Sequence, residues 1–419
     1  MTGLLSVREA QEKIIAALQP TATESAAVGA CAGRILAQQI TAPGDLPPFD
    51  NSSMDGFAVI ASDVQAAALG TPVPLDIVAD IPAGAIADRP IRSGQAARIM
   101  TGAPLPPGAD AVVPVEDTDF APGSGKSDLW GADGHGVTVQ IFQPVRPGSS
   151  VRRRGDDVRA GDLLLSPGRK LQPQDAGMIA SVGLARVQVF RKPRVALFSS
   201  GDELTQPGQP LGPGQIYDSN QTVLAAALEQ HGAEVLRLGT APDDPARIQA
   251  ILDQAVAQQA DLIVTSAGVS VGAFDYVRQV IESHGSLGFW KVNMRPGKPL
   301  AFGAYAGIPL IGLPGNPVSA FVGCRVFVLP ALYRLSGREI PYPRREKAVL
   351  TEAVESDGRE SYLRAIVTED GGKLTATLTG HQGSGNLYSL VQANALLIVP
   401  SGVKSLPSGS EVEIWFLEN

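Results

Sequence analysis

Four apolar runs in the middle of the chain decide its fold: VALFSS at 195–200, AEVLRLG at 233–239, DLIVTSAG at 261–268 and IPLIGL at 308–313. Each is short and rich in branched residues, and helical patterns stand between them. Strands that alternate with helices are typical of a parallel sheet covered on both faces. The sequence therefore predicts a doubly wound, mostly parallel α/β domain over residues 191–337.

Two of the intervening segments carry helix signals. Pro245 suits a first helical turn, and an apolar stripe of 3.6-residue period follows it at Ile248, Ile251, Leu252, Ala255 and Val256. The second segment opens on Asp218-Ser219-Asn220 and closes at Gly232, because Asx and Ser cap helix starts and Gly accepts the left-handed end. Both segments are predicted to be crossover helices.

The flanking sequence predicts β-rich domains on either side of this sheet. Between 46 and 145, five β-like pieces are separated by Pro and Gly, and a further β domain is expected over 338–419, with alternating segments at 373–380, 394–400 and 411–417. An amphipathic helix is predicted at 6–18, with Ser6 as its cap and Glu9 in the capping-box position. We expect residues 146–190 to return and pack with it, which gives a discontinuous linking domain of 1–45 and 146–190.

Composition excludes several classes of protein. The 419 residues carry a net charge of −8, which argues against a broad basic surface for nucleic acid. The two cysteines, Cys31 and Cys324, have no zinc or disulfide spacing, and the four histidines show no metal or triad pattern. No run of about 18 uncharged apolar residues is present, so neither a signal peptide nor a membrane span is expected. A cytoplasmic location fits these features.

Polar, Gly-rich loops follow all four predicted strands. Ligands of doubly wound sheets collect at the carboxyl ends of the strands, where these loops lie. Glu203, Asp243 and Asp275 would bring carboxylates to one crevice, which suits Mg²⁺ beside a phosphorylated ligand. Taken alone, Asp243 and Asp244 are better explained as a helix cap.

Two basic segments stand out in this acidic chain. Residues 290–299 contain Lys291, Arg295 and Lys298, which suit a phosphate or another oxyanion, although a solvated loop is the alternative. The run at 152–154 consists of three arginines followed by Gly155 and two aspartates. An anion site and an exposed charged turn explain that run equally well.

Several phrases together resemble the MoeA family of molybdopterin molybdenumtransferases, which also includes the E domain of gephyrin. They are DNSSMDGFAV at 50–59, IMTGAP at 99–104, GDEL at 201–204, PGKP at 296–299 and GLPGNPVS at 312–319. The resemblance covers essentially the whole chain. It departs at Ala267, where the family usually has the second residue of a Ser-Gly-Gly loop, and at Arg295, where some members carry Lys.

The resemblance implies four domains and a homodimer whose cleft lies between the sheet domain of one subunit and the β domain of the other. It implies that adenylylated molybdopterin and molybdate react with Mg²⁺ to give molybdenum cofactor and AMP. Molybdopterin-pathway proteins and molybdoenzyme acceptors are further implied partners; nucleic acid and membrane are not. Molybdate is a tetrahedral dianion, which Arg, Ser and backbone N–H groups can bind.

Site residues are carried over from the family onto matching positions of this sequence. The catalytic set is Asp55, Thr101, Asp157, Glu203, Asp243 and Asp275, of which Glu203, Asp243 and Asp275 would hold the metal. The substrate-binding set is Ser270, Lys291, Arg295, Lys298, Pro314, Asn316, Ser319, Arg364 and Ser384. Arg364 and Ser384 are assigned to molybdate and are expected to lie away from the sheet loops that hold the pyrophosphate.

Two other functions remain open at this stage. A molybdopterin adenylyltransferase would use a similar sheet domain, but it would not require the DNSSMDGFAV segment or the C-terminal β domain. A scaffold or binding role of the gephyrin type would require partner-binding features that the sequence does not identify. The sequence also leaves open whether molybdate or tungstate is the oxyanion.

Overall fold

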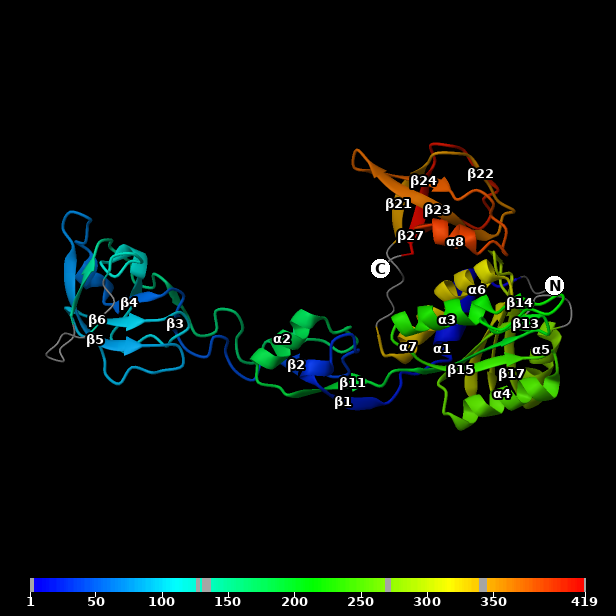
Figure 1. The fold of residues 1–419 in the computed structure, drawn as a ribbon, viewed down its shortest axis with the longest axis horizontal. Helices are drawn as coiled ribbons and strands as arrows, with labels where there is room; N and C mark the ends of the chain where they lie inside the picture. The colour runs from blue at the N-terminus through cyan, green and yellow to red at the C-terminus, as the bar shows by residue number, and fades with distance from the viewer. Residues whose placement is uncertain (1–3, 126–128, 130–136, 268–272, 339–344, 418–419) are drawn as a thin grey trace. The chain divides into compact units, whose positions relative to one another are not determined.

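The computed structural model describes residues 4–125, 129, 137–267, 273–338 and 345–417 (Figure 1). Contacts divide the chain into two compact units. Unit 1 comprises Met1–Gln38, Pro167–Ala176 and Ala185–Asn419, and unit 2 comprises Gln39–Ser166 and Gly177–Leu184. Each unit has its own sheets and cores.

The centre of unit 1 is a six-stranded sheet of order β15-β12-β16-β20-β19-β17. Its first four strands, β15 (Glu234–Ala241), β12 (Arg194–Ser200), β16 (Leu262–Ala267) and β20 (Ile308–Pro314), are parallel, which confirms the predicted doubly wound sheet. The last two, β19 (Pro299–Tyr305) and β17 (Gly285–Lys291), were not predicted; β19 is antiparallel to both of its neighbours, β20 and β17.

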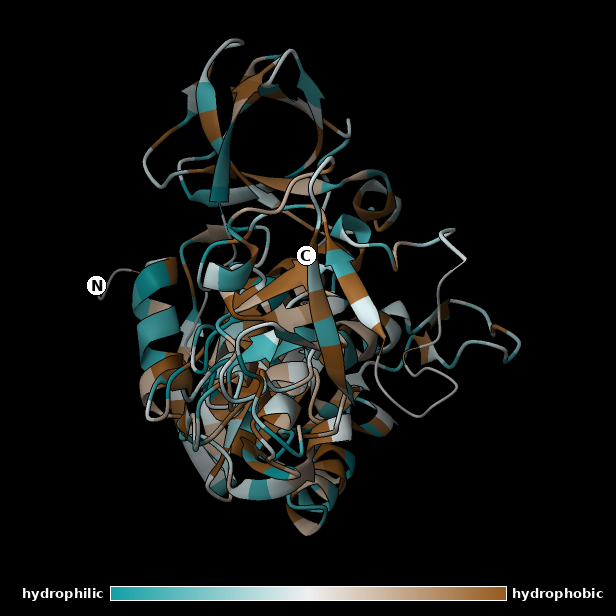
Figure 2. Cartoon of the chain, turned by 90° about the vertical axis from the view of Figure 1, so that its left-hand side faces the viewer, coloured by the Kyte–Doolittle hydropathy of each residue, from teal (hydrophilic) through white to brown (hydrophobic). Residues whose placement is uncertain are grey.

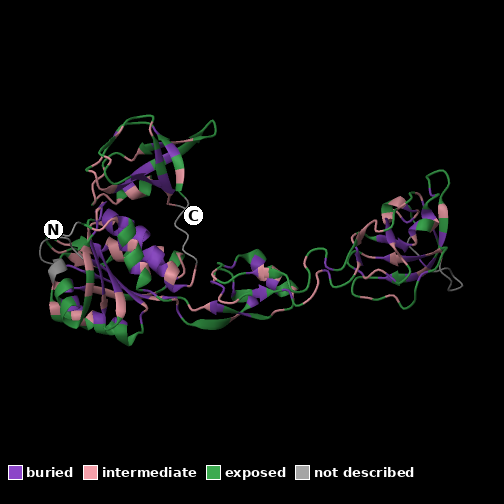
Figure 3. Cartoon of the chain, turned by 180° about the vertical axis from the view of Figure 1, so that it is seen from behind, coloured by how far each residue is buried: buried purple, intermediate pink, exposed green. Residues whose placement is uncertain are grey.

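Helices cover both faces of this sheet. One face packs on α3 (Ser219–Gln230), α6 (Pro317–Gly323) and α7 (Leu329–Leu335), and the other on α4 (Pro245–Ala257) and α5 (Ala273–His284). Alternation along β12 decides which residue faces which layer: Val195 and Leu197 join the first core, and Ala196 and Phe198 the second. In Figure 3 the inner strands of this sheet are largely buried, whereas the edge strands β15 and β17 and the outer surface of α4 are partly exposed.

The predicted helix caps are present. Asp218 accepts a hydrogen bond from the Gln221 N–H at the start of α3, and Asp244 accepts one from Arg247 N–H at the start of α4. Asp244, and not Asp243, is therefore the capping residue. The apolar residues of α6 and α7 continue through a π-helical turn at Cys324–Val328. The resulting helix, Pro317–Leu335, is long and apolar enough to cross a membrane by length and composition, but 83% of its apolar stretch is buried inside the protein.

The N-terminal helix α1 (Val7–Ala16) has the predicted capping box, in which Ser6 and Glu9 exchange hydrogen bonds. Its buried residues belong to the core of the sheet domain, and Gln11 donates to the carbonyl of Val326. The expectation that residues 146–190 pack with this helix is wrong. Instead β11 (Arg186–Phe190) pairs with β1 (Thr23–Ala27), and β10 (Leu163–Leu165) pairs with β2 (Ile40–Thr41). In both pairs the backbone N–H and C=O groups of the returning segment bond to the outgoing segment and not to the helix.

Unit 2 contains the predicted β-rich segment. Its five-stranded sheet has the order β7-β4-β6-β5-β8, formed by β7 (Ala111–Pro114), β4 (Gly56–Val59), β6 (Gln95–Ile99), β5 (Val73–Ile81) and β8 (Thr138–Ile141). Gly56 is required in β4, because a Cβ atom there would lie 2.0 Å from the carbonyl oxygen of Val113. Unit 2 also contains a two-stranded ribbon of β3 (Asn51–Ser52) and β9 (Val151–Arg152), while helix α2 (Pro173–Ser181) is divided between the two units.

The C-terminal domain is a second six-stranded sheet, of order β18-β23-β24-β21-β27-β25, in which β23 also pairs with β25 and so closes the sheet. Its strands are β21 (Arg345–Leu350), β23 (Glu360–Asp370), β24 (Lys373–Leu378), β25 (Ala395–Val399) and β27 (Glu411–Phe416). Hydrophilic and hydrophobic segments alternate in this domain (Figure 2), as they do along β27, whereas β25 is apolar and buried along its whole length. The short β18 (Met294–Arg295) comes from the sheet domain and pairs with β23, which joins the two domains.

The remaining described elements are short and lie in connections. They are β13 (Leu204–Thr205), β14 (Ile216–Tyr217), β22 (Val354–Glu355), β26 (Ser405–Leu406), α8 (Tyr388–Gln392) and the 3₁₀ turns Val28–Ala30, Ala61–Val64 and Val115–Asp117.

Candidate functional site

A cavity of about 320 Å³ lies within unit 1, between the sheet domain and the C-terminal domain. We call it the Arg364 cavity. Its walls are residues 295–299, which lead into β19, residues 314–319 from the end of β20 to the first turn of α6, residues 359–364 at the start of β23, and the loop 382–384. It brings together seven of the predicted substrate-binding residues, which are Arg295, Lys298, Pro314, Asn316, Ser319, Arg364 and Ser384.

Arg364 is the most unusual residue of this cavity. It is completely buried in β23, yet its guanidinium forms no ion pair with a carboxylate within the described ranges. Nε donates to Ser389 Oγ at 3.0 Å, and Nη2 donates to the Gly383 carbonyl at 3.0 Å. Burial, followed by the charge of Arg295, lowers the pKa of Arg364 to about 10, so it stays charged at neutral pH. A buried cation without a counter-ion is costly unless an anion occupies the space beside it.

The loop 382–384 of the C-terminal domain lies directly against the loop that follows β20. Asn316 Nδ2 donates to Ser384 Oγ at 2.9 Å, and the Val318 N–H donates to the Ser384 carbonyl at 3.1 Å. The expectation that Arg364 and Ser384 lie away from the sheet loops is therefore wrong. The β18–β23 pairing causes this closeness, because it ties the segment after β17 to the C-terminal sheet.

The other cations give the cavity a strong positive character. Arg295 and Lys298 line it beside Arg364, and Arg359 also lines it while pairing with Asp357. Among the described lining residues there is no Asp or Glu. The predicted Lys291 is exposed at the end of β17 and is not part of this wall. Such a cavity can bind a multiply charged oxyanion.

Sequence reasoning missed Arg359 and Gln382, which also line the cavity. Arg359 follows Asp357 and Gly358, a combination that indicates only a turn, and β23 was not predicted as a strand. Gln382 is one of many polar loop residues in the sequence. Its Nε2 donates to the Arg364 carbonyl and its Oε1 accepts from the Arg364 N–H, so it fixes the backbone of that arginine.

Carboxylates gather where β12 and β15 end. Asp202 Oδ1 accepts from the Asp243 N–H at 3.1 Å, and the Glu203 carboxylate folds over Gly201. Desolvation, with the charges of Asp202 and Glu203, raises the pKa of Asp243. Asp243 Oδ1 is buried and has no hydrogen-bond partner in the described structure. A cation is the natural partner for such an oxygen.

The predicted three-carboxylate metal cluster stays a prediction. In the part of the chain that the structure describes, no three His, Cys, Asp or Glu side chains stand close enough to hold a metal ion. Asp275 lies in α5, but its side chain is outside the described set, and Ser270 lies outside the described residues altogether. Glu203 and Asp243 remain the two members that can be placed.

In unit 2 the structure joins two of the predicted catalytic residues. Thr101 donates to Asp55 Oδ1 through both its N–H and its hydroxyl, each at 2.7 Å. These hydrogen bonds, the one from the backbone first, lower the pKa of Asp55, which therefore stays ionised. Asp157, the third predicted catalytic residue of unit 2, forms an ion pair with Arg152.

The basic run at 152–154 is a charged turn. Its three arginines pair in turn with Asp157, Asp50 and Asp45, all within unit 2. Each positive charge is thus already neutralised by a neighbouring carboxylate. Of the two explanations left open by the sequence, the exposed turn is the one the geometry favours.

Models of known families match three parts of the chain. Residues 5–183 match the MoeA N-terminal region (domain I and II), 196–334 match a probable molybdopterin binding domain, and 347–417 match the MoeA C-terminal region (domain IV). The chain is 42% identical over 393 residues to molybdopterin molybdenumtransferase 2 of Mycobacterium tuberculosis H37Rv, covering 92% of this chain and 93% of the relative. This chain belongs to the MoeA family.

Further members support the same assignment over the full length. The molybdopterin molybdenumtransferase of Haemophilus influenzae is 35% identical, with 98% of each chain covered. Among solved structures, a molybdopterin biosynthesis MoeA protein from Pyrococcus horikosii superposes with a TM-score of 0.81 at 33% identity, covering 100% of both chains. The family resemblance and the multidomain α/β fold inferred from the sequence are therefore confirmed.

Proposed function

We propose that the chain is a molybdopterin molybdenumtransferase, which inserts molybdate into adenylylated molybdopterin and yields molybdenum cofactor and AMP. Family membership supports this proposal, because relatives of 30–42% identity over most of the chain carry that name. The observation in this molecule that carries it is Arg364, a fully buried cation that reaches a cavity whose described lining residues include no Asp or Glu.

Each wall of the Arg364 cavity has a role in this proposal. Molybdate would be held by Arg364 and by the hydroxyl groups of Ser319 and Ser384, whose neutral donors suit a tetrahedral dianion. Arg295 and Lys298 would hold the phosphate of the pterin beside it. Because one cavity contains both sets, the two anions would be brought to reacting distance without a covalent protein nucleophile.

Mg²⁺ is part of the proposal and would be bound by Asp243 and Glu203, with Asp275 as a further candidate. The buried, unpartnered Asp243 Oδ1 fits this assignment, and Mg²⁺ commonly uses only one or two protein carboxylates together with water and phosphate. When bound, the metal would neutralise charge on the pyrophosphate as the adenylyl bond is cleaved. The carboxylates themselves would position it at the ends of β12 and β15.

We also propose a homodimer in the cytoplasm. In this arrangement Asp55, Thr101 and Asp157 of one subunit would complete the site of the other, and molybdopterin-pathway proteins and molybdoenzyme acceptors would exchange substrate and product with it. The ionised Asp55, fixed by Thr101, would serve as a rigid acceptor for substrate donors. The proposed functional division has domains of 46–145, 191–337 and 338–419 and a linking domain of 1–45 with 146–190, from which α1 packs into the core of the sheet domain.

The decisive experiment measures AMP release from adenylylated molybdopterin with and without molybdate, in the presence of Mg²⁺. An insertion enzyme releases AMP in a molybdate-dependent manner. An adenylyltransferase would instead consume ATP and molybdopterin, and a pure scaffold would show neither reaction. Molybdate-independent release, or none at all in a folded protein, would overturn the proposal, and tungstate in place of molybdate tests the choice of oxyanion.

A further inference from the structure

A second cavity, of about 150 Å³, lies within unit 1 and shares no lining residue with the Arg364 cavity. We call it the His231 cavity. It is bounded by the turn after β1, the link between β11 and β12, the end of α3 and the end of α7. Pro193 places it at the amino end of β12, whereas Pro314 places the Arg364 cavity at the carboxyl end of the parallel strand β20. The two cavities therefore lie at opposite ends of the parallel strands.

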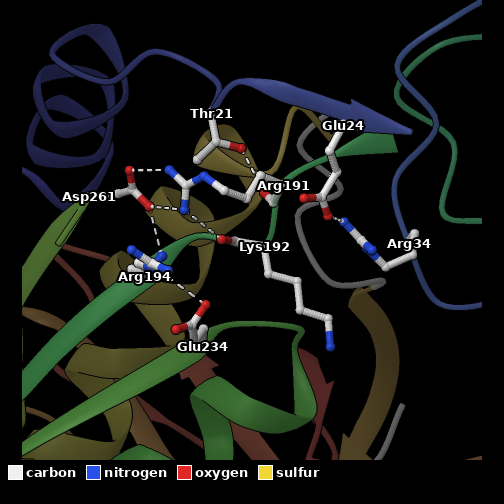
Figure 4. Close-up of polar contacts among 8 residues, drawn as sticks. All are labelled: Thr21, Glu24, Arg34, Arg191, Lys192, Arg194, Glu234 and Asp261. Carbon is white, nitrogen blue, oxygen red and sulfur yellow. Dashed lines mark hydrogen bonds and ion pairs between the residues drawn. The ribbon is translucent and has the colours of Figure 1, made fainter. Parts of the chain in front are cut away.

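Five permanent cations line the His231 cavity, and two of them are neutralised. Arg191 forms a two-pronged pair with Asp261, with N–O distances of 2.8 and 3.0 Å. Arg34 pairs with Glu24 and also donates to the Phe190 carbonyl at 2.9 Å. These pairs are drawn in Figure 4. We interpret these ion pairs as structural, because they fix the link between β11 and β12.

The other three cations are Lys170, Lys192 and Arg338, and none forms an ion pair with a carboxylate of the described residues. In Figure 4 the Lys192 ammonium group points away from the Arg191–Asp261 pair and has no partner among the residues drawn. The Arg338 guanidinium stacks over the Tyr333 ring at 4.5 Å. Three positive charges thus meet at one small cavity in a chain whose net charge is −8.

His231 and Tyr333 form the neutral wall of the cavity. The Tyr333 hydroxyl lies 2.6 Å from His231 Nδ1. Burial, and then the charges of Arg325, Lys170 and Arg338, lower the pKa of His231 to about 4. The imidazole is therefore uncharged at neutral pH, and two of the cations that lower its pKa, Lys170 and Arg338, also line the cavity.

We propose that the His231 cavity is a second anion site, which binds a phosphate group through Lys170, Lys192 and Arg338. Its volume suits one tetrahedral dianion and not a polyanion such as nucleic acid, and converging Lys and Arg side chains are the usual partners of phosphate. The phosphate comes either as the free inorganic ion or as the phosphate of a mononucleotide. The site is independent of the Arg364 cavity and does not rest on its proposed function.

Two histidines provide a built-in test of this assignment. His231 reports on its own cavity, and His381, whose carbonyl accepts from Arg364 Nη2, reports on the other. In full-length protein with ¹³C-labelled histidine, the His231 signal is identified by its loss in His231→Gln. Titration with inorganic phosphate should shift that signal in a saturable manner, whereas sodium chloride of equal ionic strength should not.

Two double variants distinguish specific phosphate binding in the His231 cavity from a general effect of surface charge. Lys170→Gln combined with Lys192→Gln removes two exposed cations of the cavity and should raise the half-saturating phosphate concentration at His231 about tenfold or more. The control combines Lys13→Gln with Lys373→Gln, two exposed lysines elsewhere, and should leave the His231 curve unchanged. Both variants should leave the His381 response as in the wild type.

A parallel titration with AMP identifies the source of the phosphate. Saturation of the His231 signal at lower AMP than phosphate concentrations assigns the site to a mononucleotide, and the reverse order assigns it to free phosphate. The proposal is overturned if neither ligand moves the His231 signal at millimolar concentrations. It is also overturned if the cavity variant and the control variant respond identically.

Discussion

Replacing Arg364 with lysine keeps a positive charge in the cavity but removes the planar fork of donors. The wild-type guanidinium is fixed by Ser389 and by the Gly383 carbonyl, which leaves Nη1 without a hydrogen bond to the described residues. A lysine ammonium cannot be fixed by those partners and present the same donor to an oxyanion. Arg364→Lys therefore tests geometry separately from charge.

The expected loss follows from the hydrogen bond that is removed. A charge-assisted hydrogen bond contributes about 1.5–3 kcal/mol, so molybdate binding should weaken about ten- to a hundredfold. The neighbouring Ser384→Ala loses a neutral hydroxyl, worth about 0.5–1.5 kcal/mol, and should weaken it severalfold. Arg345→Lys, which alters an exposed ion pair with Glu413 in the same domain, is the matched control and should change little.

The assay is a molybdate titration of AMP release, accompanied by direct binding of adenylylated molybdopterin and by a thermal melt of each variant. Arg364→Lys should need more molybdate for half-maximal release while its affinity for the pterin changes less. The reasoning is refuted if a folded Arg364→Lys enzyme keeps the wild-type molybdate dependence and loses pterin binding instead. An equal shift in Arg345→Lys would show that the effect is general electrostatics.

Three further predictions concern the carboxylates and His231. Asp243→Asn and Asp275→Asn should each raise the Mg²⁺ concentration that half-maximal AMP release requires, and unchanged Mg²⁺ curves would remove these residues from the metal site. Mixed dimers of an Asp55→Ala and a Glu203→Ala subunit should regain activity, because one of the two active sites then carries both substitutions and the other carries none. Absence of activity in verified mixed dimers would contradict an active site shared between subunits. The pKa of His231 is about 4 in the folded protein and 6.5 in the unfolded chain, so the unfolded chain binds more protons between these pH values. The free energy of unfolding should therefore fall by at most about 2 kcal/mol from pH 7 to pH 5. Thermal melts at both pH values should show a smaller acid loss in His231→Gln, and an equal loss in that variant would assign the acid sensitivity to other groups.

Local features of the fold could be predicted from the sequence because they depend on neighbours in the chain. The four parallel strands were identified from apolar runs, and the caps at Ser6, Asp218 and Asp244 from single side chains that reach an N–H three residues ahead. Strand β17 was missed because Gly285, Gly288 and Lys291 leave few apolar residues in it, and β19 was missed because Pro299 at its start directly follows the basic segment. Family phrases added the site residues, which periodicity alone does not reveal.

The sequence by itself thus determined the doubly wound sheet, the β-rich flanks and the types of residue that meet an oxyanion. Only the tertiary structure decided which cations are available to do so. Arg153 is neutralised by Asp50, which is 103 positions away in the chain, whereas Arg364 is buried beside the cavity with no carboxylate partner among the described residues. The physical reason is that a charge is paired or left unpaired by contacts across distant segments, and the strand pairing of Met294–Arg295 with β23 is what brings those segments together.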